Sequence, residues 1–143
     1  MIIHTTAEGI SLAKKLENDS AAFYESRAGD FPKFSETFLN FAKENRKNII
    51  NTERTYFSAI SDAIEGCFAL NLETDNYNLD TAKKTDASPA SFIKQATQME
   101  EKIRKYYLDA GEQMKAQMTD VSRSFTLTAK KRNARLEQLS GLE

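Results

Sequence analysis

The residues of this sequence that could do chemistry are polar side chains at positions where helical spacing would place apolar ones. They comprise two carboxylates, two amides and two guanidinium groups: Glu17, Glu100, Asn45, Asn48, Arg132 and Arg135. Paired carboxylates inside a helical protein can bind divalent metal ions, and guanidinium groups can instead bind carboxylates through parallel hydrogen bonds. An arginine stays protonated and is no useful metal ligand. The set therefore raises a choice between a metal centre and a salt-bridge cluster.

Each of these residues taken singly is also compatible with an ordinary position at the edge of a helix's buried face. A chain in which 29% of the residues are charged must place some of them there. All six, however, fall near the middle of an apolar stripe. Because burying an ion without compensation costs several kcal/mol, we expect the six to satisfy one another or to hold an ion.

Four amphipathic helices are predicted to carry these residues. Apolar residues recur at spacings of three and four over about 6–28, 33–65, 89–118 and 121–139, as is typical of a helix with one buried face. The segment 5–8 matches a capping box at the start of the first helix. Gly66 is predicted to stop the second helix, and Ser88 followed by Pro89 is a typical start for the third.

The connection between the second and third predicted helices is long, at about residues 67–87, and shows no helical spacing. A helix of about 30 residues is about 45 Å long, whereas about 20 extended residues can span up to about 70 Å. This connector can therefore run along the outside and return the chain to its starting end. We predict a single all-α domain over residues 1–143, an antiparallel four-helix bundle with one long crossover between helices two and three.

Short motifs surround the two carboxylates and recur in both halves of the chain. Glu17 is followed seven residues later by Tyr24, and Glu100 by Tyr107, each within a Phe-Tyr or Tyr-Tyr pair. The segments 41–48 (FAKENRKN) and 128–135 (TAKKRNAR) occupy corresponding places in the second and fourth helices. With these motifs the sequence resembles the rubrerythrin branch of the ferritin-like superfamily over nearly its whole length. The resemblance implies a ferritin-like bundle that binds two iron ions through a Glu on helices one and three and a Glu-x-x-His on helices two and four.

The sequence departs from this pattern at four of the six implied ligand positions. The two carboxylates are retained, but Asn45 and Asn48 replace the Glu and His of the second helix, and Arg132 and Arg135 replace those of the fourth. We therefore expect no bound metal, and a degenerate di-iron site in which the two guanidinium groups take the place of the metal ions. The charges of the two Glu and the two Arg then cancel.

Tyr24 and Tyr107 allow two interpretations. Their hydroxyl groups could donate hydrogen bonds to the two carboxylates, or they could be plain aromatic residues of the core. The sole histidine, His4, lies outside the predicted bundle and leaves no imidazole for a metal site.

Other candidate features are expected to have no catalytic role. Cys67 is interpreted as a small apolar residue rather than a reactive thiol, and Glu44 as part of a solvated face. The basic run at 130–132 could suggest a nucleic-acid patch, but Arg132 is predicted to face inward.

Composition excludes several classes of function. The chain has 20 Lys and Arg against 21 Asp and Glu, a net charge of −1, which predicts binding to neither nucleic acid nor an anionic membrane. Its start resembles no signal peptide, and no apolar run approaches the length of about 20 residues that spans a bilayer. We expect a cytoplasmic protein.

Three functions stay open at this point. The first is a non-catalytic binding or assembly protein, with an unknown protein partner and, by resemblance, a homodimeric state. The second is a metal-dependent oxidoreductase that uses iron or manganese at a divergent site for peroxide or oxygen chemistry. The third is a carrier of a small ligand.

Overall fold

The computed structural model describes residues 1–60, 68–85 and 88–142. This part of the chain is predominantly helical, which confirms the predicted all-α class. The four helices are α1 (Thr6–Arg27), α2 (Ser35–Ile60), α3 (Pro89–Met114) and α4 (Thr119–Ser140). Two short strands, β1 (Ile2–Thr5) and β2 (Phe68–Glu73), and two 3₁₀ turns, Ala28–Asp30 and Thr74–Tyr77, complete the described elements.

The starts of α1 and α3 follow from their sequences. The hydroxyl of Thr5 accepts a hydrogen bond from the backbone N–H of Glu8 at 3.1 Å, and the Glu8 carboxylate accepts one from the N–H of Thr5 at 3.0 Å. This is the predicted capping box. At α3 the Ser88 hydroxyl accepts from the N–H of Ser91 at 3.2 Å, and Pro89 occupies the first helical position. Both helix starts are as predicted.

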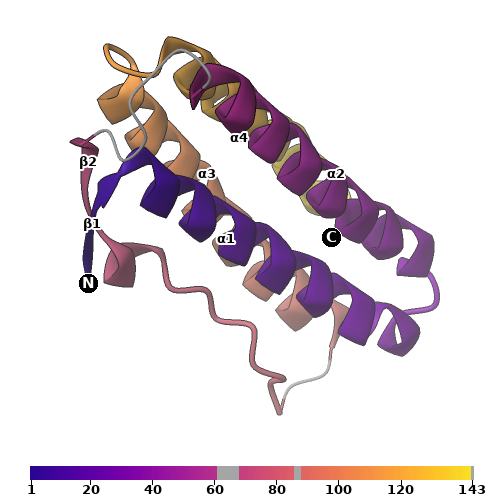
Figure 1. Cartoon of the computed structure of the whole chain (residues 1–143). Helices are drawn as coiled ribbons and strands as arrows, with labels where there is room; N and C mark the ends of the chain where they lie inside the picture. The colour runs from indigo at the N-terminus through magenta and orange to yellow at the C-terminus, as the bar shows by residue number, and fades with distance from the viewer. Residues whose placement is uncertain (61–67, 86–87, 143) are drawn as a thin grey trace.

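The helices pack as two antiparallel hairpins, α1 with α2 and α3 with α4 (Figure 1). In addition, α1 contacts α3 and α2 contacts α4. Figure 1 also shows that α2 and α3 run in the same direction, with the chain after β2 following the side of α1 back to the start of α3. Gly66 and Cys67, for which the sequence predicted a helix stop and an apolar residue, lie outside the described residues.

A small antiparallel sheet includes the start of the segment for which the sequence predicted only a connector without helical spacing. β1 pairs with β2 so that Ile2 faces Glu73, Ile3 faces Leu72 and Thr5 faces Phe68, with an irregularity between Ile3 and Thr5. The physical reason is burial, since alternate residues of β2, Leu70 and Leu72, are buried while their neighbours point outward. Such alternation is typical of a half-buried strand, but the sequence did not indicate which segment would pair with this strand.

Several predicted helix ends also differ from the observed ones. The second helix begins at Ser35 rather than at residue 33, and residues 61–65 of the prediction lie outside the described part. The third helix ends at Met114 instead of residue 118, and the fourth begins two residues early, at Thr119. Residues 115–118 thus form a short connection that the sequence pattern did not separate from the helix.

Aromatic side chains fill the interior on both sides of its middle. One group, toward the end of α1, contains a stacked pair of Phe23 and Phe92, 4.8 Å between ring centroids. The other lies toward the start of α1 and places the rings of Tyr107 and Phe125 edge to face at 5.0 Å. The polar residues singled out above lie between these two groups.

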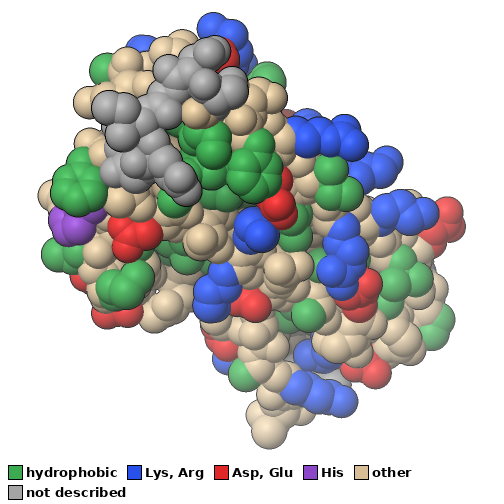
Figure 2. All heavy atoms as spheres, viewed as in Figure 1, with side chains coloured by type: hydrophobic (Ala, Val, Ile, Leu, Met, Phe, Trp, Pro, Cys, Tyr) green, Lys and Arg blue, Asp and Glu red, His purple; other side chains and the backbone are tan. Residues whose placement is uncertain are grey.

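The surface carries charges of both signs. On the face seen in Figure 2, Lys and Arg side chains are interleaved with Asp and Glu side chains. Among the described residues, no helix combines the length and the apolar character needed to cross a bilayer.

Candidate functional site

The six polar residues singled out in the sequence are all buried. Their exposed fractions range from 0% for Asn45 and Glu100 to 5% for Asn48. They come from all four helices, because the helical period turns one position per turn of each helix toward the common interior. The expected inward orientation is therefore observed for each of them: Glu17 on α1, Asn45 and Asn48 on α2, Glu100 on α3, and Arg132 and Arg135 on α4.

Arg132 lies between the two carboxylates. Its Nη2 donates to Oε2 of Glu17 at 2.7 Å, and its Nη1 donates to Oδ1 of Asn45 at 2.9 Å. Its Nε lies 3.1 Å from Oε2 of Glu100, an ion pair without the geometry of a hydrogen bond. A single guanidinium group thus contacts α1, α2 and α3 at once.

Arg135 makes a second set of contacts one turn further along α4. Its Nη1 donates to Oε1 of Glu100 at 3.0 Å and to Oδ1 of Asn45 at 2.6 Å. Its Nη2 donates to the backbone carbonyl of Phe41 at 3.1 Å and to Oε2 of Glu44 at 3.2 Å. The guanidinium carbon also lies 4.7 Å from the centre of the Phe41 ring, close enough for a cation–π attraction.

The two tyrosines bind the carboxylates in a crosswise pattern. Tyr24 of α1 donates its hydroxyl to Oε1 of Glu100 on α3, and Tyr107 of α3 donates to Oε1 of Glu17 on α1, both at 2.7 Å. The pKa of each tyrosine lies far above its ordinary value, mainly because of burial and secondly because of the carboxylate that it contacts. Both hydroxyls therefore stay protonated and act as donors, the first of the two interpretations left open by the sequence.

Two further side chains join the cluster that the sequence interpretation did not include. Ser20 is fully buried on α1 and accepts a hydrogen bond from the side-chain amide of Asn45 at 2.8 Å. Glu44 is 59% exposed, as a solvated residue should be, yet it reaches Arg135. The signal for Ser20 was its place on the same helical stripe as Glu17, whereas nothing in the sequence indicated that Glu44 would turn back to α4.

Asn48 is buried but does not belong to this network. Its side chain forms no hydrogen bond to any residue that the structure describes, and it lines a hollow between α2 and α4 instead. The expected cluster of six is therefore a cluster of five, and Ser20 and Glu44 extend it.

Opposite charges balance inside the cluster. Burial would raise the pKa of Glu100, but Arg132 and Arg135 outweigh it and hold that pKa below its ordinary value. Burial would lower the pKa of Arg132, but Glu100 and Glu17 raise it above its ordinary value. Glu100 and Arg132 are therefore both charged at neutral pH. Two guanidinium groups thus face two carboxylates inside the protein, and a third carboxylate, that of Glu44, lies at the rim of the cluster.

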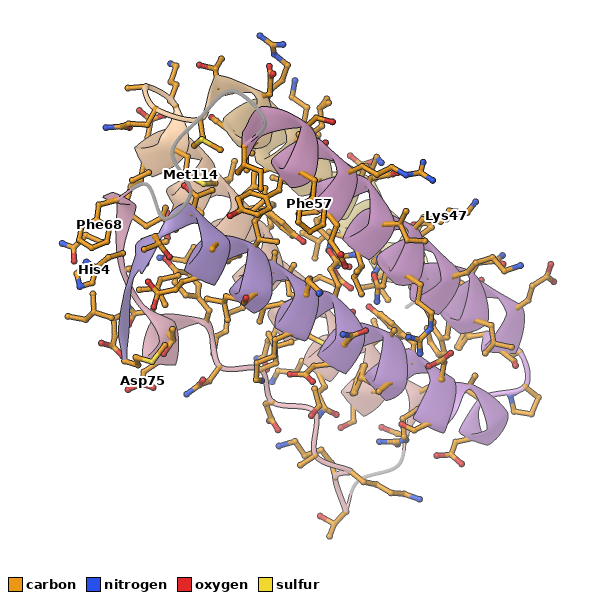
Figure 3. All side chains as sticks on the ribbon, viewed as in Figure 1. His4, Lys47, Phe57, Phe68, Asp75 and Met114 are labelled. Atoms are coloured by element: carbon orange, nitrogen blue, oxygen red, sulfur yellow. The ribbon has the colours of Figure 1, made fainter. Side chains whose placement is uncertain are left out.

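The residues present do not fit a dinuclear metal centre. Within the described ranges, no three His, Cys, Asp or Glu side chains gather as a metal site would require. Oxygens of Glu17 and Glu100 already accept from arginine and tyrosine donors, and the guanidinium groups fill the space between the carboxylates. His4 lies beside Phe68 at the edge of the molecule (Figure 3), with ring centroids 6.1 Å apart.

The basic run at residues 130–132 does not form a continuous surface patch, because Arg132 is buried while Lys130 and Lys131 are exposed.

Comparison with family models, with curated proteins and with solved structures gave no match. The cluster itself must therefore indicate what the protein can do. Its paired charges hold four helices together and leave neither a free nucleophile nor an unpaired acid–base group among its members.

Proposed function

We propose that this chain is a ferritin-like four-helix bundle of the rubrerythrin type, in which two arginines replace the metal ions, and that it acts as a non-catalytic binding or assembly protein. The observation that carries the proposal is the position of Arg132 between Glu17 and Glu100. Those are the two positions at which this sequence keeps the acidic ligands that the resemblance implies. A cytoplasmic location, a homodimeric state and an unknown protein partner belong to the same proposal.

The arrangement of the helices supports the bundle part of the proposal. Two antiparallel hairpins with α2 and α3 parallel (Figure 1) require the chain to travel the length of the molecule between them. Helix bundles with one long crossover connection have this chain path.

The energetics of buried charge support the metal-free part. A pair of metal ions would need anionic and imidazole ligands, whereas the pocket now contains two permanent positive charges. For a metal ion to enter, both guanidinium groups would have to leave contacts of 2.6–3.2 Å. Desolvated cations next to a metal cation would repel it strongly, since the interior screens charges poorly.

Elemental analysis of the purified protein tests this proposal. After expression with added iron and manganese, we expect far less than one metal ion per chain, because arginines occupy the pocket. The positive control is a variant that restores the ligand types implied by the resemblance: Asn45→Glu, Asn48→His, Arg132→Glu and Arg135→His. Near-stoichiometric iron or manganese in the unmodified chain, lost on Glu17→Ala, would contradict the proposal and favour the metal-dependent oxidoreductase.

A further inference from the structure

A hollow of 320 Å³ lies between α2 and α4, next to the arginine cluster. Its volume is at the lower end of the range of about 300–1,000 Å³ that is common for small-molecule sites. The helical period brings positions three and four apart on each helix to its walls. The lining of the hollow includes Glu44, Lys47, Asn48, Lys131 and Arg135.

A buried amide without a hydrogen-bond partner among the described residues borders this hollow. Asn48 is 5% exposed and forms no hydrogen bond to any residue in the described ranges. Buried polar side chains nearly always have a hydrogen-bond partner, and the Asn48 amide stays open to solvent or to a ligand in the hollow. The Asn48 side chain can offer two N–H donors and a carbonyl acceptor to a molecule in the hollow.

Positive charge predominates around the same space. Lys47 and Lys131 line it from opposite helices, and neither forms an ion pair with a residue that the structure describes. Figure 3 shows Lys47 on the outer side of α2, away from the interior. Arg135 contributes a third positive charge, and Glu44 is the one acidic residue of the lining. Two lysines that form no ion pair within the described part of the chain, together with an amide donor, are suited to bind phosphate or carboxylate oxygens.

Glu44 shows that a carboxylate can bind at this place. Its Oε2 lies 3.2 Å from Nη2 of Arg135, although the side chain is 59% exposed. Because the Glu44 side chain is mostly exposed, its pairing with Arg135 is weak, and an anion from solution can replace it. The backbone carbonyl of Phe41 and the interior contacts hold Arg135 in position when Glu44 leaves.

We propose that this hollow binds a small oxyanion, the phosphate or carboxylate group of a small molecule. Lys47 and Lys131 contact the oxyanion from either side, Asn48 donates a hydrogen bond to it, and it displaces Glu44 from Arg135. This inference goes beyond the proposed function and does not depend on whether a metal binds. Its readout is anion affinity, whereas that of the proposed function is metal content, so either can fail alone.

Isothermal titration of the full chain with inorganic phosphate at constant ionic strength tests the site. We expect saturable binding that is weakened about tenfold in the variant Lys47→Gln, Lys131→Gln, since each exposed cation contributes modestly. The matched control is Lys43→Gln, Lys130→Gln, which removes the same charge from the same two helices outside the hollow. The control should bind phosphate as the unmodified chain does. Absence of saturable binding, or equal weakening in both variants, would overturn the proposal.

Glu44→Gln tests the displacement of the internal carboxylate. Removing this competitor should tighten phosphate binding about threefold, since the mostly exposed Glu44 pairs only weakly with Arg135. Weaker or unchanged binding would show that Glu44 is not displaced and would overturn that part. Titration with acetate in parallel distinguishes the two sources of the oxyanion, because comparable acetate affinity assigns a carboxylate ligand and binding of phosphate alone assigns a phosphate ester.

Discussion

At the level of single residues, the charge balance of the buried cluster depends on Arg132, which contacts both buried carboxylates. Its side chain is 1% exposed and lies 2.7 Å from Glu17 and 3.1 Å from Glu100. A buried pair of this kind is weak evidence for stability in itself, because desolvation offsets much of the attraction. The loss of one partner has a much larger effect, since it leaves an unpaired charge in the interior.

Arg132→Leu should therefore destabilise the protein by about 3–5 kcal/mol. A fully apolar variant should lose much less free energy of unfolding, because it leaves no charge and no tyrosine hydroxyl without a partner. It combines Glu17→Leu, Tyr24→Phe, Glu100→Leu, Tyr107→Phe, Arg132→Leu and Arg135→Leu. Urea unfolding measures both. The control Lys130→Leu, at an exposed position of the same helix, should change the free energy by no more than about 0.5 kcal/mol. A smaller loss for Arg132→Leu than for the apolar variant would contradict the salt-bridge interpretation.

The lowered pKa of Glu100 predicts a dependence of stability on pH. Because its pKa in the folded protein lies below the ordinary value of 4.5, the ionised carboxylate stabilises the fold above that pH, and this contribution is lost as the pH falls further. The free energy of unfolding should decrease more gently below pH 4.5 in Glu100→Gln than in the unmodified chain. The exposed neighbour variant Glu101→Gln should keep the original slope. Parallel slopes for Glu100→Gln and the unmodified chain would show that this carboxylate is not held ionised.

At the level of elements, the sequence predicted the helices well and the sheet not at all. Helix starts depend on local hydrogen bonds, such as those of the capping box of Thr5 and Glu8. They can therefore be predicted from neighbouring residues in the sequence. Strand β2 depends on a partner 69 residues away, since Ile3 faces Leu72, and no local sequence pattern spans that separation. The alternation of Leu70 and Leu72 was visible, but pairing is a property of two segments.

At the level of the whole molecule, the cluster connects all four helices through one set of contacts. Glu17, Asn45 and Glu100 come from three helices, and all three meet Arg132 of the fourth. Separating the two hairpins would pull Glu17 of α1 away from Arg132 of α4, two opposite charges in a poorly screening interior. The two hairpins should therefore not unfold independently.

We expect a single cooperative unfolding transition in urea. Circular dichroism reports on all the helices, and tyrosine fluorescence reports on the interior, because the chain contains no tryptophan. The two signals should have coincident midpoints, as a two-state transition requires. Two separate midpoints would show that the cluster does not link the hairpins.

The sequence by itself determined which side chains face inward, because the helical period sets the direction of each residue around its own axis. It thereby indicated the burial of Glu17, Asn45, Asn48, Glu100, Arg132 and Arg135. The tertiary structure decided which of them meet. Contact between different helices depends on how those helices pack, which no spacing within one helix contains. For that reason the structure alone revealed that Asn48 borders a hollow, and that Glu44 reaches Arg135 from the surface.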